Sequence, residues 1–158
     1  MSILKTLLTI GGILAMSNAA IANDGETKLT IINPKNLYDP TPNGYSTAVV
    51  TFPNARIAYI SGQGGADHTG AYSPDFAAQV KQAYANLQSA LEGIGAKPNQ
   101  VAKLTTFVVD HDVSKLGVLT ENVKKVFGDT LPAQTLVPVP RLAIDPMLFE
   151  VEAIVVLD

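Results

Sequence analysis

The apolar residues of this chain repeat with a helical period in two segments and with a strand-like period between them. From residue 76 to 95 they form one helical stripe: Phe76, Val80, Ala83, Leu87, Leu91 and Ile94. Ser73-Pro74 predicts the N-cap with proline at the first helical position, and Gly93 and Gly95 predict the end. The next segment, 101–110, is short and β-branched, which predicts a strand.

The other segments complete an α+β pattern. The sequence predicts a short strand and a loop within 23–46, strands at 47–53 and 55–62, a second helix over 116–127 that ends at Gly128, and strands at roughly 134–140 and 148–157. The two strands around Pro53-Asn54 are expected to form a hairpin, and His111-Asp112 to cap the second helix. The predicted order is ββαβαββ in a single α+β domain.

The last two strands carry positional signals. Pro138 and Pro140 lie two residues apart, so both missing N–H groups fall on the same edge, which predicts a strand at the border of the sheet. In the final strand, alternation puts Glu150 and Glu152 on one face with Ile154 and Val156. Each carboxylate either lies on a half-exposed face or lines a pocket, where it could orient a water or carry a proton.

The N-terminus predicts export. Lys5 precedes an apolar run from about Leu7 to Met16, and the small-residue pattern Ala20-Ile21-Ala22 follows, which is the layout of a secretory signal cleaved after residue 22. The run is too short for the ~20 residues of a membrane-spanning helix. We therefore expect a signal peptide at 1–22, a mature domain at 23–158, a periplasmic or secreted location, and no membrane association after cleavage.

Composition narrows the chemistry. There is no Cys, which excludes disulfides, thiolate catalysis and Cys-based zinc sites. The net charge of −3 argues against nucleic-acid binding. The two histidines, His68 and His111, are not spaced as a helical metal-binding pair. The glycine-rich stretch GQGGADHTG (62–70) matches no phosphate-binding motif, so an ordinary loop is expected, and no GxSxG elbow occurs.

Several short motifs follow one another in a distinctive order. They are Tyr45, YISGQ (59–63), QVKQAYANLQSALEGIGA (79–96), VAKLTTFVVD (101–110), LPAQT (131–135), PRL (140–142) and FEVEAIVVL (149–157). Together, over roughly residues 30–158, they resemble the Rid family (reactive intermediate deaminases, also called the YjgF family). The resemblance implies a chorismate-mutase-like fold with helices packed on one sheet face, and a homotrimer with ligand clefts between subunits. It also implies hydrolysis of 2-imino or 2-enamino acids without metal or cofactor.

The resemblance assigns site residues position by position. Tyr45 matches a pocket tyrosine, Ser61 and Gly62 match a turn that faces the ligand, and Glu150 matches the glutamate that positions the hydrolytic water. A pocket asparagine on the second helix has two candidate positions. Spacing back from Phe127 indicates Glu121, whereas residue identity indicates Asn122.

Gln134 departs from the family pattern. Deaminating members carry PAR[ST], whose arginine grips the substrate carboxylate, but this chain has PAQT. A Gln amide has neither the charge nor the fork of a guanidinium. Loss of one charge-assisted contact costs about 1.5–3 kcal/mol, roughly ten-fold or more in binding a carboxylate. Arg141 aligns with the family's RL position and, by alternation, lies on the opposite strand face from Gln134.

Three hypotheses for function remain. The first is an exported Rid-type homotrimer whose imino-acid deaminase activity is weakened, or redirected to an uncharged imine. The second is a non-catalytic trimer that binds a small molecule or acts as a holdase. The third is an endoribonuclease, which the acidic chain and the lack of a basic cluster disfavour.

Overall fold

The computed structural model describes residues 29–157, so the predicted signal peptide lies outside the described residues. The elements, in chain order, are β1 (Thr30–Ile32), η1 (Thr41–Asn43), β2 (Ala48–Val50), β3 (Arg56–Gly64), α1 (Phe76–Gly93), η2 (Pro98–Gln100), β4 (Val101–Val109), η3 (Val113–Lys115), α2 (Leu116–Phe127), β5 (Ala133–Val139) and β6 (Phe149–Leu157). The α+β class and the ββαβαββ order are confirmed, with the short strand β1 in front. Within 29–157 no helix is both long enough and apolar enough to cross a membrane.

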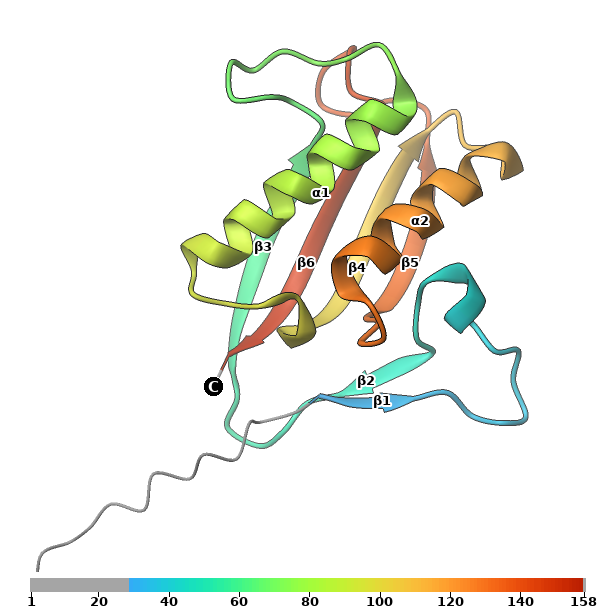
Figure 1. Cartoon of the computed structure of the whole chain (residues 1–158), viewed down its shortest axis with the longest axis vertical. Helices are drawn as coiled ribbons and strands as arrows, with labels where there is room; N and C mark the ends of the chain where they lie inside the picture. Colours follow the sequence, from blue (N-terminus) through green and yellow to red (C-terminus); the bar gives the residue numbers. More distant parts are fainter. Residues whose placement is uncertain (1–28, 158) are drawn as a thin grey trace, which may run out of the picture.

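The main sheet has the strand order β3-β6-β4-β5. Strand β6 is antiparallel to both of its neighbours, whereas β5 runs parallel to β4. Figure 1 shows both helices, α1 and α2, lying across the same face of this sheet. Strand β5 is at the border, as the prolines predicted. The expected cap of α2 at His111-Asp112 is displaced: Asp112 caps the preceding turn η3, and α2 itself begins without a side-chain cap.

The predicted hairpin around Pro53-Asn54 is wrong. Strand β2 pairs with β1 in a separate two-stranded sheet, and β3 pairs with β6 along most of its length. The chain does turn at Asn54, where φ is +63°. However, β3 forms its backbone hydrogen bonds with the longer strand β6. The turn therefore connects two separate sheets and not two paired strands.

The predicted N-cap of α1 is displaced by two residues. Asp75, not Ser73, has the extended backbone of a cap, and its side chain accepts a hydrogen bond of 2.7 Å from the N–H of Ala78. Ser73 instead accepts from the N–H of Asp75. A carboxylate accepts more strongly than a hydroxyl at the positive end of a helix, so Asp75 takes the capping position.

The hydrophobic core lies between α1, α2 and one face of the sheet. Tyr84 and Phe149 are in ring contact at 5.8 Å between centroids, and Phe76 meets Phe149 edge-on at 6.4 Å. The alternate β6 residues Val151, Ala153 and Val155 belong to the same core. Their burial under the helices sends the residues between them to the helix-free face of the sheet.

Gln79 is a fully buried polar residue at the start of α1. Its amide nitrogen donates to the carbonyl oxygens of Ser73 (2.7 Å) and Pro146 (2.6 Å), and its amide oxygen accepts from the N–H of Leu148 (2.9 Å). These bonds tie together the loop before α1 and the loop that leads into β6. Gln79 therefore fixes the start of the strand that carries Glu150.

We expect Gln79→Leu to lower the free energy of unfolding by about 2–3 kcal/mol, because it leaves three part-buried backbone groups without their protein partner. Urea denaturation followed by circular dichroism measures this change. The exposed residue Gln88 lies on the same helix, and Gln88→Leu should change stability by less than about 0.5 kcal/mol. Equal effects of the two substitutions would show that the Gln79 bonds contribute little.

Candidate functional site

A β-bulge in β3 brings three of the candidate residues together. Ile60 pairs with Ala153, and Gln63 pairs with Val151. Two residues of β3, Ser61 and Gly62, therefore lie opposite the one β6 residue between Val151 and Ala153. The side chain of Glu150 lies directly against Gly62, because a Cβ placed there would overlap its Oε1 atom. Glu150 is half-buried, whereas Ser61 and Gly62 are exposed. At the bulge, the carboxylate thus packs against Gly62 and remains partly exposed to solvent.

Tyr45 lies in a loop held between α2 and the start of β5. The preceding Gly44 has φ +82°, and a Cβ on it would touch Val123 of α2. Ser46 donates from its N–H to the carbonyl of Pro132 (2.9 Å) and from its hydroxyl to that of Leu131 (2.6 Å). Tyr45 itself is half-buried beside the first residues of β5.

Gln134 is the second residue of β5, next to this loop. Its register partner on the parallel strand β4 is Leu104, which is buried in the core under the helices. Partners in a parallel ladder point to the same face, so Gln134 lies on the helix side. Its Oε1 atom is buried and has no hydrogen-bond partner. A buried acceptor normally has a donor, and a bound ligand could provide the one that Gln134 lacks.

Within one chain the candidates form two separate groups. The first half-site contains Tyr45 and Gln134 at the start of β5. The second half-site contains Ser61, Gly62 and Glu150 at the bulge. Gln134 is on the helix side of the sheet and Glu150 on the helix-free side, so the two groups do not converge within a single protomer.

The structure separates the two α2 candidates from both half-sites. Asn122 donates to the carbonyl of Val118 one turn earlier (2.8 Å) and faces a hollow between α1 and α2, and Glu121 is exposed. Thr120 of α2, like Val123, does reach the Tyr45 loop, and its hydroxyl donates to the carbonyl of Asn43 at 3.3 Å. Sequence reasoning missed Thr120, because neither residue identity nor spacing from Phe127 indicated it.

Arg141 is not positioned to replace an arginine at residue 134. It lies beyond the end of β5, is exposed, and forms an ion pair of 3.1 Å with Asp145. Its partner therefore lies four residues away in the same loop.

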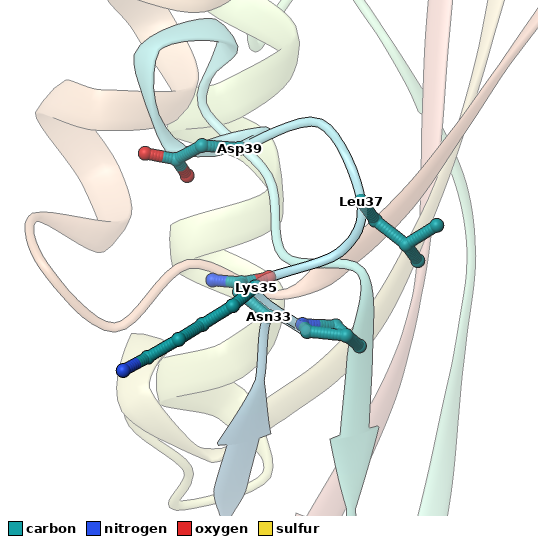
Figure 2. Close-up of a pocket in the computed structure, with 5 residues that line it drawn as sticks. Asn33, Lys35, Leu37 and Asp39 are labelled. Atoms are coloured by element: carbon teal, nitrogen blue, oxygen red, sulfur yellow. The ribbon is translucent and has the colours of Figure 1, made fainter.

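Three of the surface hollows within residues 29–157 lie elsewhere. One of about 340 Å³ is lined by the loop residues 33–39, and Figure 2 shows that Lys35 and Leu37 extend from it in different directions. Another, of about 610 Å³, lies between η1 and the end of α2, and the third lies between the helices. None of these three is lined by a residue of either half-site. Among residues 29–157, no three His, Asp or Glu side chains cluster as metal ligands would.

The fold, with two helices on a mixed four-stranded sheet, is an α+β fold that matches solved structures of YjgF-like proteins. A Rid-family protein of unknown function, YyfB from Yersinia pestis, has a similar structure, with a TM-score of 0.79, 32% identity, and coverage of 82% of this chain and 99% of that one. RidA from the Antarctic bacterium Psychrobacter is similar with a TM-score of 0.59 and 32% identity, over 72% of this chain and 88% of its own.

Sequence comparison agrees with the structural one. The family model described as "Endoribonuclease L-PSP" matches residues 38–157. A 2-iminobutanoate/2-iminopropanoate deaminase of Salmonella typhimurium is 36% identical over 89 residues, 56% of this chain and 69% of that protein. A RutC family protein of Pyrococcus abyssi is 33% identical over 118 residues, 73% of this chain and 88% of its own. The chain belongs to the Rid (RidA/YjgF) family.

We expect Gly62→Ala to move the Glu150 carboxylate while the fold persists. The new methyl group overlaps the far end of a flexible side chain, which can rotate away at a cost of about 1 kcal/mol. A crystal structure of the variant, with urea denaturation, checks both parts. Gly93→Ala is the control, because nothing lies within 4 Å of the added Cβ. An unmoved Glu150 would contradict the close packing.

Proposed function

We propose that this protein is an exported, homotrimeric imine hydrolase of the Rid family that acts on neutral imines in preference to imino acids. The observation that carries the proposal is the Glu150 carboxylate, half-buried and seated on Gly62 at the bulge. The similarity to a 2-iminobutanoate/2-iminopropanoate deaminase supports the reaction type. The apolar N-terminal run and the Ala20-Ile21-Ala22 pattern support export to the periplasm or medium.

Glu150 acts as the base of the hydrolysis. Its carboxylate accepts a hydrogen bond from a water and takes a proton as the water oxygen bonds to the imine carbon. The C=N bond becomes a single bond, and its nitrogen receives the proton from Glu150. Glu150 then takes the proton of the new hydroxyl group and passes it to the amine nitrogen, the carbonyl forms as the C–N bond breaks, and ammonia leaves. We assign substrate binding to the hydroxyl of Ser61, because this residue is exposed and lies in the bulge.

Gln134 sets the preference for an uncharged substrate. Its amide offers one acceptor oxygen and one –NH₂ group, and the oxygen is buried without a partner. A substrate carboxylate has hydrogen-bond acceptors and no donor, so it would leave the amide oxygen of Gln134 without a partner. A carboxamide both donates and accepts and so pairs with both ends of the Gln134 amide. We therefore assign imines that carry a carboxamide as the substrate class.

The catalytic site forms between subunits. The two half-sites lie on opposite faces of one sheet, so a complete site takes Tyr45 and Gln134 from one protomer and Glu150 from another. The helix-free face also exposes apolar side chains that a second copy would cover, namely Ile57 (41% exposed), Tyr59 (78%) and Ile154 (37%). A closed ring of three copies satisfies both requirements.

The same apolar face favours the second candidate function, a non-catalytic trimer that binds a small molecule or acts as a holdase. Tyr59 is its most exposed member. This alternative needs no proton transfer at Glu150, so a catalytic assay separates the two functions.

The substrate assignment predicts the behaviour of Gln134→Arg. Wild type should hydrolyse 2-iminopropanamide faster than 2-iminopropanoate, and Gln134→Arg should raise the rate on 2-iminopropanoate roughly ten-fold or more. Gln134→Lys, which adds charge without a fork, is the matched control and should gain less. Both imines are generated in situ, and release of pyruvate or pyruvamide is followed. A wild type that prefers 2-iminopropanoate would overturn the assignment.

The catalytic role predicts that Glu150→Gln lowers the turnover rate by about 10²–10⁴-fold, because the amide cannot accept the proton. Glu152→Gln changes an exposed carboxylate two residues along the same strand and should keep most of the activity. Stopped-flow measurement of ammonia release at matched protein concentration gives both rates. Equal activity of wild type and Glu150→Gln would favour the binding-protein function.

A subunit-mixing experiment tests the shared site. Tyr45→Ala removes the first half-site and Glu150→Gln removes the second, so each variant alone should be inactive. Unfolding and refolding them together leaves roughly a quarter of the interfaces with both halves intact, and a similar fraction of activity should return. Sedimentation equilibrium checks the trimer. No recovery from mixed trimers would place the complete site within one chain.

A further inference from the structure

A hollow of about 170 Å³ lies between the two helices, on the side of the sheet away from Glu150. Helices α1 and α2 run side by side over the sheet in Figure 1 and pack against one another. Five of the seven residues that line the hollow have a polar or cationic side chain, and the full set is Lys81, Tyr84, Ala85, Gln88, Asn122, Lys125 and Val126. None of these residues belongs to either half-site of the proposed hydrolase.

Tyr84 is the only buried residue among those that line this hollow, with 1% of its surface exposed. Its ring packs on Phe149, but its hydroxyl has no hydrogen-bond partner. Burial also raises the pKa of Tyr84, so the hydroxyl remains a protonated donor. A buried hydroxyl without a partner costs folding free energy, and a native protein retains one where a ligand or water completes it.

The charge around the hollow is positive. Lys81 extends from α1 and Lys125 from α2, and no carboxylate lines the space between them. Within residues 29–157 neither lysine forms an ion pair. The side chain of Asn122 uses one N–H on the carbonyl of Val118 and retains a second. The hollow is thus lined by two cations, by an amide with an unused N–H and by a tyrosine whose buried hydroxyl has no partner.

We propose that this hollow is a binding site for a small oxyanion of the phosphate class, held by Lys81, Lys125 and the hydroxyl of Tyr84. Its volume is below the ~300–1,000 Å³ of sites for drug-sized ligands, which restricts it to a single small anion. A phosphate group carries about −1.5 to −2 charges at pH 7, which matches two lysines. A monocarboxylate neutralises only one of them.

The test uses the full mature protein in chloride buffer at constant ionic strength, titrated with inorganic phosphate. We expect saturable binding by calorimetry and a matching rise in melting temperature. Tyr84→Phe removes one oxygen and keeps the ring on Phe149, so it should raise the melting temperature without phosphate and weaken phosphate binding about ten-fold. This combined result distinguishes a binding hydroxyl from a purely structural one.

Lys125→Gln should weaken phosphate binding about ten-fold or more, whereas its neighbour Lys124→Gln should change it less than two-fold, because Lys124 lines a different hollow. Tighter binding of glycerol phosphate than of inorganic phosphate would support a phosphate ester as the ligand. Acetate binding as tight as phosphate binding would overturn the phosphate class. Any of three results would overturn the proposed site. They are phosphate binding that does not saturate, equal effects of Lys124→Gln and Lys125→Gln, and phosphate binding that Tyr84→Phe leaves unchanged.

Discussion

The packing of α1 against β3 and β6 determines the placement of Glu150 and of the bulge beside it. The buried stripe of α1 and the alternate residues of β6 share one core, centred on the contact between Tyr84 and Phe149. Because Phe149 and Val151 face the helix, the alternation of the strand places Glu150 on the opposite face of the sheet. Gln79 reinforces this arrangement from the end of the helix, since it holds the loop that enters β6. The position of the carboxylate is thus a consequence of core formation.

Most of the secondary structure could be predicted because local patterns encode it. The stripe from Phe76 and the terminating glycines located α1, and the prolines located β5 at the border. Pairing was harder. The hairpin around Pro53-Asn54 was expected from chain proximity, but β3 finds a longer partner in β6, almost a hundred residues later in the chain. Tertiary competition of this kind leaves no local signal.

The site was predictable in its residue types and less so in its geometry. The motifs indicated Glu150 with Ser61 and Gly62, and the structure brings these three together at a bulge. The face occupied by Gln134 depends on its register with Leu104, which a single strand does not specify. Thr120 escaped attention because its contact with the Tyr45 loop joins segments 77 residues apart.

The two borders of the main sheet are both poor templates for a further strand. At one border Pro138 offers no N–H, and Ser46 already bridges the first residue of β5. At the other, the bulge at Ser61–Gly62 breaks the even spacing of exposed backbone groups along β3. These features disfavour edge-to-edge stacking of copies of this sheet. Ser61 and Gly62, the second of which lies against Glu150, thus also help to protect one edge of the sheet.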